Sequence, residues 1–121
     1  MGYTLIVDDS ATERSIITGC LKEVGIDVSV ALSGEEALEK IEQKYPDLIV
    51  LDIVLPGRSG FEICRQLKNS EDTNKIPIIL CSTKGTDMDK FWGKKQGADA
   101  YIPKPIDQAE LVRTVQNLIV I

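Results

Sequence analysis

The sequence predicts an α/β fold in which helices cover both faces of a parallel sheet. Hydrophobic periodicity along the chain switches repeatedly between short apolar runs and helical spacing, giving five strand–helix repeats. Several runs are almost continuously apolar, as expected for strands that are buried on both sides. At 121 residues the chain has the usual length of one domain, so we expect residues 1–121 to form a single domain.

The strands are predicted from their apolar runs and from the turn residues around them. They are expected at residues 4–7, 27–31, 47–51, 76–81 and 100–102. Right-handed crossovers place the carboxyl ends of parallel strands at one edge of the sheet, which is where such folds bind ligands.

The helices between the strands are predicted from apolar stripes and from residues that favour helix ends. Stripes mark the first and last helices, with Ile17, Cys20, Leu21 and Val24 before Gly25 in the first, and Leu111, Val115 and Leu118 in the last. Helix starts are expected at Ser10, Ser33 and Asp107, whose side-chain oxygens can accept the free amide hydrogens of a first turn. Ser33 and Glu36 have the spacing of a capping box.

Composition excludes several classes of function. There are no histidines, which removes hydrolases with a catalytic histidine and histidine-ligated metal sites. The three cysteines are far apart and lack CxxC spacing, so we expect them to be small core residues. A net charge of -5 without a basic run argues against nucleic-acid binding. No apolar run is long enough to span a bilayer, and the start lacks the pattern of a secretory signal, so a cytoplasmic location is expected.

Carboxylates follow two of the predicted strands. Asp8 and Asp9 come directly after the first strand, and Asp52 ends the apolar run of the third. If these strands are neighbours, three carboxylates meet, and two unpaired charges about 4 Å apart repel by roughly 4 kcal/mol at an effective dielectric near 20. A hard divalent cation with oxygen ligands, most simply Mg²⁺, would offset this repulsion.

A hydroxyl and a lysine follow two further strands, the fourth and the fifth. Ser82 follows the fourth run, and Lys104 lies between two prolines after the fifth. A carboxylate such as Asp52 can attack a phosphoryl group, while a hydroxyl and an ammonium can bind its oxygens. Taken singly, each has an ordinary alternative: Asp52 can cap a turn, Lys104 can be a surface residue, and Thr83 could replace Ser82.

Together these residues resemble the receiver domain of bacterial two-component response regulators. The matching segments are LIVDDS at 5–10, DLIVLDIVLPGRSG at 47–60, IPIILCST at 76–83 and GADAYIPKP at 97–105, and the resemblance covers essentially the whole chain. It implies a doubly wound, flavodoxin-like sheet of five strands in the order 2-1-3-4-5.

The resemblance implies a phosphorelay protein that depends on Mg²⁺. Asp52 would accept a phosphoryl group from a phosphohistidine on a sensor histidine kinase or phosphotransfer domain. Asp8, Asp9, Asp52 and the backbone carbonyl of Val54 would hold the metal, and Lys104 would pair with the phosphoryl group. Such a domain is not an enzyme in the usual sense, although it catalyses its own phosphorylation and dephosphorylation.

The resemblance also implies a switch and an output surface. Ser82 would move to bind the phosphoryl group, and Tyr101 would turn inward into the space that Ser82 leaves. The responding surface would comprise the fourth helix, fifth strand and fifth helix, including Phe91, Trp92 and Lys95, and would control a downstream effector protein. Trp92 is expected to be at least partly buried.

The segments Phe91-Trp92-Gly93 and Gln96-Gly97-Ala98-Asp99-Ala100-Tyr101 resemble single-domain receivers of twitching-motility and phototaxis pathways. Chemotaxis motor switching and phosphate storage are alternative outputs.

Two departures from the family pattern lie next to Asp52. Leu55 stands where the family usually has methionine, and Val54 brings no polar side chain two residues after the acceptor. We expect Val54 to position a hydrolytic water poorly, so that autodephosphorylation is slow. The Lys104–Pro105 peptide bond is expected to be cis, as in many receivers.

Three other functions remain open from the sequence. A pseudo-receiver would use the same fold as a phosphate-independent interaction module. A phosphatase with an aspartate nucleophile needs a second aspartate where this chain has Val54. A flavodoxin-like flavin carrier would have a hydroxyl-rich loop in place of Asp8 and Asp9.

Overall fold

In the computed structural model, which describes residues 2–83 and 86–119, five strands alternate with five helices. The elements are β1 (Tyr3–Val7), α1 (Ala11–Glu23), β2 (Asp27–Ala31), α2 (Gly34–Gln43), β3 (Leu48–Asp52), α3 (Gly60–Lys68), β4 (Ile78–Ser82), α4 (Asp87–Lys95), β5 (Ala100–Pro103) and α5 (Gln108–Leu118). Within the described ranges, no helix combines the length and apolar character needed to cross a membrane.

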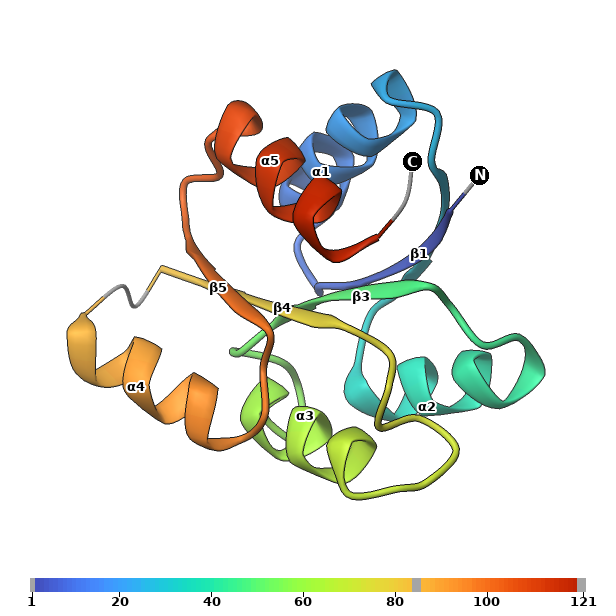
Figure 1. Cartoon of the computed structure of the whole chain (residues 1–121), viewed down its shortest axis with the longest axis vertical. Coiled ribbons are helices and arrows are strands. Elements are labelled where there is room, and N and C mark those ends of the chain that lie inside the picture. Colours follow the sequence, from blue (N-terminus) through green and yellow to red (C-terminus); the bar gives the residue numbers. More distant parts are fainter. Residues whose placement is uncertain (1, 84–85, 120–121) are drawn as a thin grey trace.

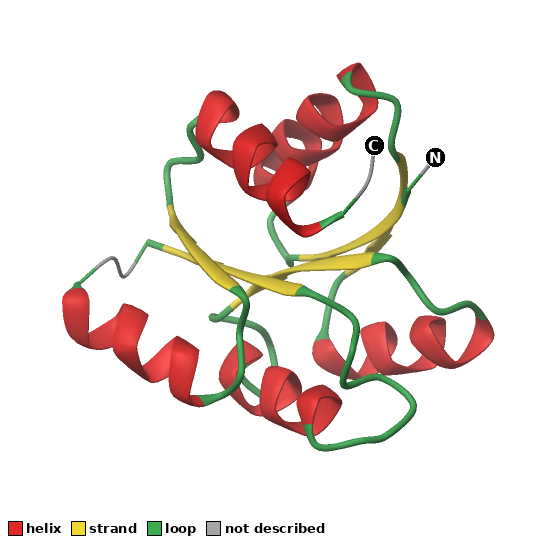
Figure 2. Cartoon of the chain, in the orientation of Figure 1, coloured by secondary structure: helices red, strands yellow, loops and turns green. Residues whose placement is uncertain are grey.

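The five strands form one parallel sheet in the order β2-β1-β3-β4-β5, the order that the family resemblance implied. Helices α1 and α5 cover one face, and α2, α3 and α4 cover the other (Figures 1 and 2). The order reverses between β1 and β3, so the chain leaves their carboxyl ends toward opposite faces. This is the switch point at which doubly wound sheets bind ligands.

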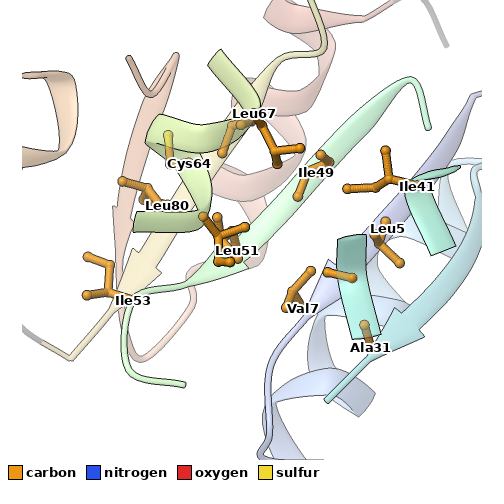
Figure 3. Packing of buried hydrophobic residues seen from close by; sticks show 13 residues of the cluster. Leu5, Val7, Ala31, Ile41, Ile49, Leu51, Ile53, Cys64, Leu67 and Leu80 are labelled. Atoms are coloured by element: carbon orange, nitrogen blue, oxygen red, sulfur yellow. The ribbon is translucent and has the colours of Figure 1, made fainter. Parts of the chain in front are cut away.

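Two apolar layers hold the helices on the sheet. On the face of α2 and α3, one layer contains Leu5, Val7, Ile49, Leu51 and Leu80 among its buried residues (Figure 3). On the other face the predicted stripes of α1 and α5 pack against the sheet through residues including Ile17, Leu21, Leu111 and Val115. Alternate residues of β1 and β3 enter opposite layers, which explains why their sequences are almost continuously apolar.

The strand ends differ slightly from the predicted ones. β4 begins at Ile78 because Ile76 closes a turn through its N–H to the Thr73 carbonyl, and Pro77 has no amide hydrogen. β3 extends to Asp52, which pairs with Cys81 in the ladder. The predicted acceptor and hydroxyl are thus the last residues of their strands.

The predicted helix starts are confirmed. Ser10, Ser33 and Asp107 are N-caps whose side chains accept amide hydrogens from the first turn. Ser33 accepts from the Glu36 N–H at 3.2 Å, which is one of the two hydrogen bonds of a capping box. Both bonds are present at the start of α4, between Thr86 and Asp89. Gly25 has φ 82° just after α1, the left-handed conformation expected there.

All three cysteines are buried free thiols, as the composition predicted. Burial is the main cause that raises the pKa of Cys64 to about 11 and that of Cys81 to about 12. Trp92 is 52% exposed, so the side chain is only half covered and is not a core residue.

Candidate functional site

Three carboxylates converge at the carboxyl ends of β1 and β3. These strands are parallel neighbours, with Val7 opposite Leu51, so the residues that follow each strand lie at the same edge. One carboxylate oxygen from each of Asp8, Asp9 and Asp52 can be chosen such that all three lie within 4.8 Å of one another. Asp8 and Asp52 are buried, whereas Asp9 is exposed. The predicted acidic cluster is therefore present, with one member open to solvent.

Lys104 brings a positive charge to the two buried acids. Its Nζ lies 2.7 Å from Asp8 Oδ2 and 3.6 Å from Asp52 Oδ2, and its side chain is 7% exposed. The lysine follows β5, where its backbone N–H donates to the Ser82 carbonyl at 2.8 Å. The Lys104–Pro105 bond is cis, as predicted. Sequence reasoning placed Lys104 near the cluster but did not identify Asp8 as its partner.

Backbone amides fix the orientation of both buried carboxylates. The Ser10 N–H donates to Asp8 Oδ1 at 2.9 Å, and the Val54 N–H faces Asp52 Oδ1 at 3.4 Å. Val54 itself is 57% exposed. These contacts use one oxygen of each carboxylate, while the second oxygen of each faces Lys104.

The start of α3 packs directly on the end of β3. The Gly60 N–H donates to the Ile53 carbonyl at 2.8 Å, and a Cβ on Gly60 would lie 2.2 Å from the Asp52 carbonyl oxygen. That separation is far inside van der Waals contact, and both groups belong to the backbone. Glycine is therefore required where α3 meets the end of β3.

Burial and neighbouring charges shift the pKa values of Asp52 and Lys104. Burial raises the pKa of Asp52; the nearby ammonium of Lys104 lowers it, and the carboxylate of Asp8 raises it. For Lys104, burial lowers the pKa, but the hydrogen bond to Asp8 and the charge of Asp52 outweigh it and leave the pKa raised. Lys104 is thus held in its charged form.

Ser82 and Tyr101 lie beside this cluster on adjacent strands. Ser82 is fully buried at the end of β4, whereas neighbouring Thr83 is exposed. Tyr101 is partly buried on β5 and packs against the core layer of α2 and α3. Burial raises the pKa of Tyr101, and a side-chain hydrogen bond with Ser82 lowers it. The two predicted switch residues are therefore in contact.

Two residues of α1 near the site were not anticipated from the sequence. Arg14 Nη1 donates to the Asp8 carbonyl at 3.0 Å. Glu13 Oε2 is buried and has no hydrogen-bond partner within the described part of the chain. Glu13 lies four residues before buried Ile17, so helical spacing is a signal that could have placed it on the inner face.

The donor set fits a divalent cation. Three carboxylates offer hard oxygen ligands at one point, and the exposure of Asp9 leaves that point open to solvent. Ions such as Mg²⁺ are bound in proteins by a few carboxylates together with retained waters. The cluster could therefore hold such an ion between β1 and β3.

Comparison with known proteins gives one consistent result. A family model described as the response regulator receiver domain matches residues 4–116. Protein PilH of Pseudomonas aeruginosa is 40% identical over 119 residues, covering 98% of this chain and 98% of that protein.

Solved structures agree with the sequence comparison. A putative response regulator from Chloroflexus aurantiacus has a TM-score of 0.93 and 35% identity, covering 97% of this chain and 96% of that one. The chemotaxis protein CheY4 of Vibrio cholerae has a TM-score of 0.91 and 30% identity, covering 98% and 99%. With its strand order, its convergent acids and these relatives, the chain belongs to the response regulator receiver domain family.

Proposed function

We propose that this chain accepts a phosphoryl group from the phosphohistidine of a sensor histidine kinase or phosphotransfer domain onto Asp52, in a Mg²⁺-dependent reaction. The observation that carries the proposal is the joint position of Asp8, Asp9 and Asp52 with Lys104 at 3.6 Å from the acceptor carboxylate. This arrangement supplies a nucleophile, a cation site and a fixed counter-charge at one edge of the sheet. We expect this phosphoryl transfer to take place in the cytoplasm.

The chemistry would consist mainly of positioning and charge stabilisation. An oxygen of Asp52 forms a bond to phosphorus while the bond from phosphorus to the donor imidazole breaks, and the electron pair returns to that nitrogen. Mg²⁺ held by Asp8, Asp9, Asp52 and the Val54 carbonyl would neutralise charge on the phosphoryl oxygens. Lys104 would bind another of these oxygens, so the domain would catalyse its own phosphorylation.

The phosphoryl group would then act through Ser82 and Tyr101. It adds negative charge and three acceptor oxygens, one of which the Ser82 hydroxyl can bind. Because Ser82 and Tyr101 are in contact, a move of one requires a response from the other. The surface around α4, β5 and α5 would thereby change and control an effector protein.

Exposed aromatic residues support an output role for this surface. Phe91 is 54% exposed and Trp92 is 52% exposed on α4, the helix next to β5. Aromatic side chains of this kind commonly anchor protein interfaces. The resemblance to single-domain receivers of twitching-motility and phototaxis pathways suggests the kind of pathway in which this output acts.

The test is phosphorylation by a small-molecule phosphodonor. We expect the wild-type chain with Mg²⁺ to gain one phosphoryl group by intact-mass spectrometry, and Asp52→Asn or removal of Mg²⁺ to prevent it. Asp72→Asn is a matched control because Asp72 is an exposed aspartate outside the cluster. If Asp52→Asn is labelled as much as the wild type, the acceptor is a residue other than Asp52. Absence of labelling in every chain would favour the pseudo-receiver, a phosphate-independent interaction module.

A further inference from the structure

Gly93 occupies a place in α4 where glycine has no conformational purpose. It lies inside the helix, is buried, and is not among the described glycines with positive φ, which are Gly25, Gly57 and Gly97. Glycine inside a helix costs about 1 kcal/mol relative to alanine. The reason for Gly93 must therefore be sought in what packs against it.

Side chains from three other elements fill the space where a Gly93 side chain would lie. A Cβ there would be 3.1 Å from Leu80 Cδ1, 3.2 Å from Tyr101 Cδ2 and 3.7 Å from Phe61 Cε1. The first two separations are tighter than ordinary van der Waals contact. Gly93 thus allows the Tyr101 ring of β5 to lie directly against the backbone of α4.

The other end of Tyr101 reaches the phosphoryl switch. Tyr101 is opposite Leu80 in the ladder between β4 and β5, and Ser82 is two residues further along β4 on the same face as Leu80. The Tyr101 side chain is hydrogen-bonded with Ser82. One side chain therefore spans the distance from the α4 backbone to the hydroxyl that would bind a phosphoryl oxygen.

We propose that Gly93 is a positioning residue for this switch: by lacking a side chain it seats Tyr101 between α4 and Ser82, and so couples the position of α4 to the availability of Ser82. This inference rests on the proposed function. According to this inference, Gly93, which follows Trp92 in α4, links the exposed aromatic residues of that helix to the phosphoryl site.

The packing of Tyr101 against Gly93 favours the unphosphorylated arrangement of the switch. While Tyr101 rests on Gly93, its hydrogen bond with Ser82 holds the serine beside the tyrosine, and Ser82 must leave that position to meet a phosphoryl group. A methyl group at position 93 would crowd the ring. Leu80 is fully buried in the core and has little room to yield, whereas Tyr101 is only partly buried, so the tyrosine is the neighbour that must move. Displacing it should release Ser82.

The experiment is a double-mutant cycle between positions 93 and 101. Affinity for beryllofluoride, a phosphoryl mimic, is measured by calorimetry with Mg²⁺ on the wild type, Gly93→Ala, Tyr101→Ala and the double variant. We expect Gly93→Ala to bind the mimic about threefold more tightly when Tyr101 is present, and to have no effect when it is absent, as for directly coupled residues.

Gly19→Ala is the matched control. Gly19 is also inside a helix, but a Cβ there meets nothing within 4 Å. It therefore adds the same helix propensity without touching the switch, and its affinity for the mimic should equal that of the wild type.

The outcomes separate the two proposals. If Gly93→Ala behaves like Gly19→Ala, or shifts affinity equally in both Tyr101 backgrounds, the role of Gly93 is overturned while the phosphoryl switch stands. If wild type neither binds the mimic nor takes up a phosphoryl group, the proposed function fails and the inference fails with it. Should Gly93→Ala not fold, recovery of folding in the double variant would identify the Tyr101 ring as the crowded neighbour; failure of the double variant would point to Leu80 instead, and the inference would be wrong.

Discussion

Lys104 is the residue on which the charge balance of the site depends. Its ammonium contacts two carboxylates that are themselves almost fully buried. A buried ion pair contributes little compared with an apolar replacement of the whole pair, but removing one partner leaves a buried charge uncompensated. The two carboxylates would also repel each other once Lys104 is gone.

We expect Lys104→Met to lower the free energy of unfolding by about 3 kcal/mol in metal-free buffer at neutral pH. Urea unfolding followed by circular dichroism measures this loss. Arg58→Met is the control, because the Arg58–Glu62 pair is 3.7 Å apart with side chains 39% and 54% exposed, and solvent-exposed pairs contribute about 0–1 kcal/mol. Similar losses in the two variants would show that Lys104 does not balance the cluster.

The site residues were predictable because carboxylates and a hydroxyl are conspicuous at the ends of apolar strands. Their detailed pairing was not. Lys104 and Asp8 are separated by 96 positions, and only the packed sheet shows that they form the shorter ion pair. Glu13 was missed because an acidic residue in a first helical turn is common at the surface, where its charge favours the helix start.

At the scale of elements, the junction of β3 with α3 leaves no freedom for a side chain. The Gly60 position faces the Asp52 carbonyl oxygen and the Ile53 Cα, which a Cβ would approach to 2.2 and 2.8 Å. Backbone atoms cannot rotate away as a side chain can. An added methyl group must push α3 away from β3.

Gly60→Ala is therefore expected to lower the free energy of unfolding by about 1–3 kcal/mol, as overpacking typically does. It should also slow phosphorylation by at least about tenfold, because small displacements of reacting groups are costly. The free energy of unfolding and the phosphorylation rate are both compared with those of Gly19→Ala, which should gain stability from helix propensity alone. Unchanged phosphorylation in Gly60→Ala would mean that the junction does not fix the acceptor.

Among the elements, existence and order were easier to predict than boundaries. β2 matches its prediction, since residues 27–31 are bounded by turn signals. β5 extends to Pro103 because Pro103 pairs with Ser82 at the sheet edge. The carbonyl of Ser82 also accepts the N–H of Lys104, a ladder partner that the sequence does not reveal.

At the scale of the molecule, the reversal of strand order concentrates negative charge at one edge of an already acidic protein. The chain carries a net charge of -5, and three of its carboxylates meet where β1 and β3 end. Folding brings these charges together, whereas in the unfolded chain Asp52 is remote from Asp8 and Asp9. An ion that binds only the folded cluster must stabilise the whole fold through mass action.

Mg²⁺ should therefore raise the free energy of unfolding by about 2.7 kcal/mol when its concentration is 100 times its dissociation constant. Asp9→Asn is the informative variant, because Asp9 is exposed and its replacement leaves the core intact. We expect this variant to lose most of the Mg²⁺ effect. In chelator it should be at least as stable as wild type, since one source of repulsion is removed.

Thermal unfolding with chelator and with a Mg²⁺ series measures both effects. Asp72→Asn removes an equal charge from an exposed position outside the cluster and should keep the full response to Mg²⁺. Sodium chloride at matched ionic strength separates binding from general screening, which acts alike on all exposed charges. If salt alone reproduces the stabilisation, or if Asp9→Asn retains it, the cluster between β1 and β3 does not bind the ion in the folded chain.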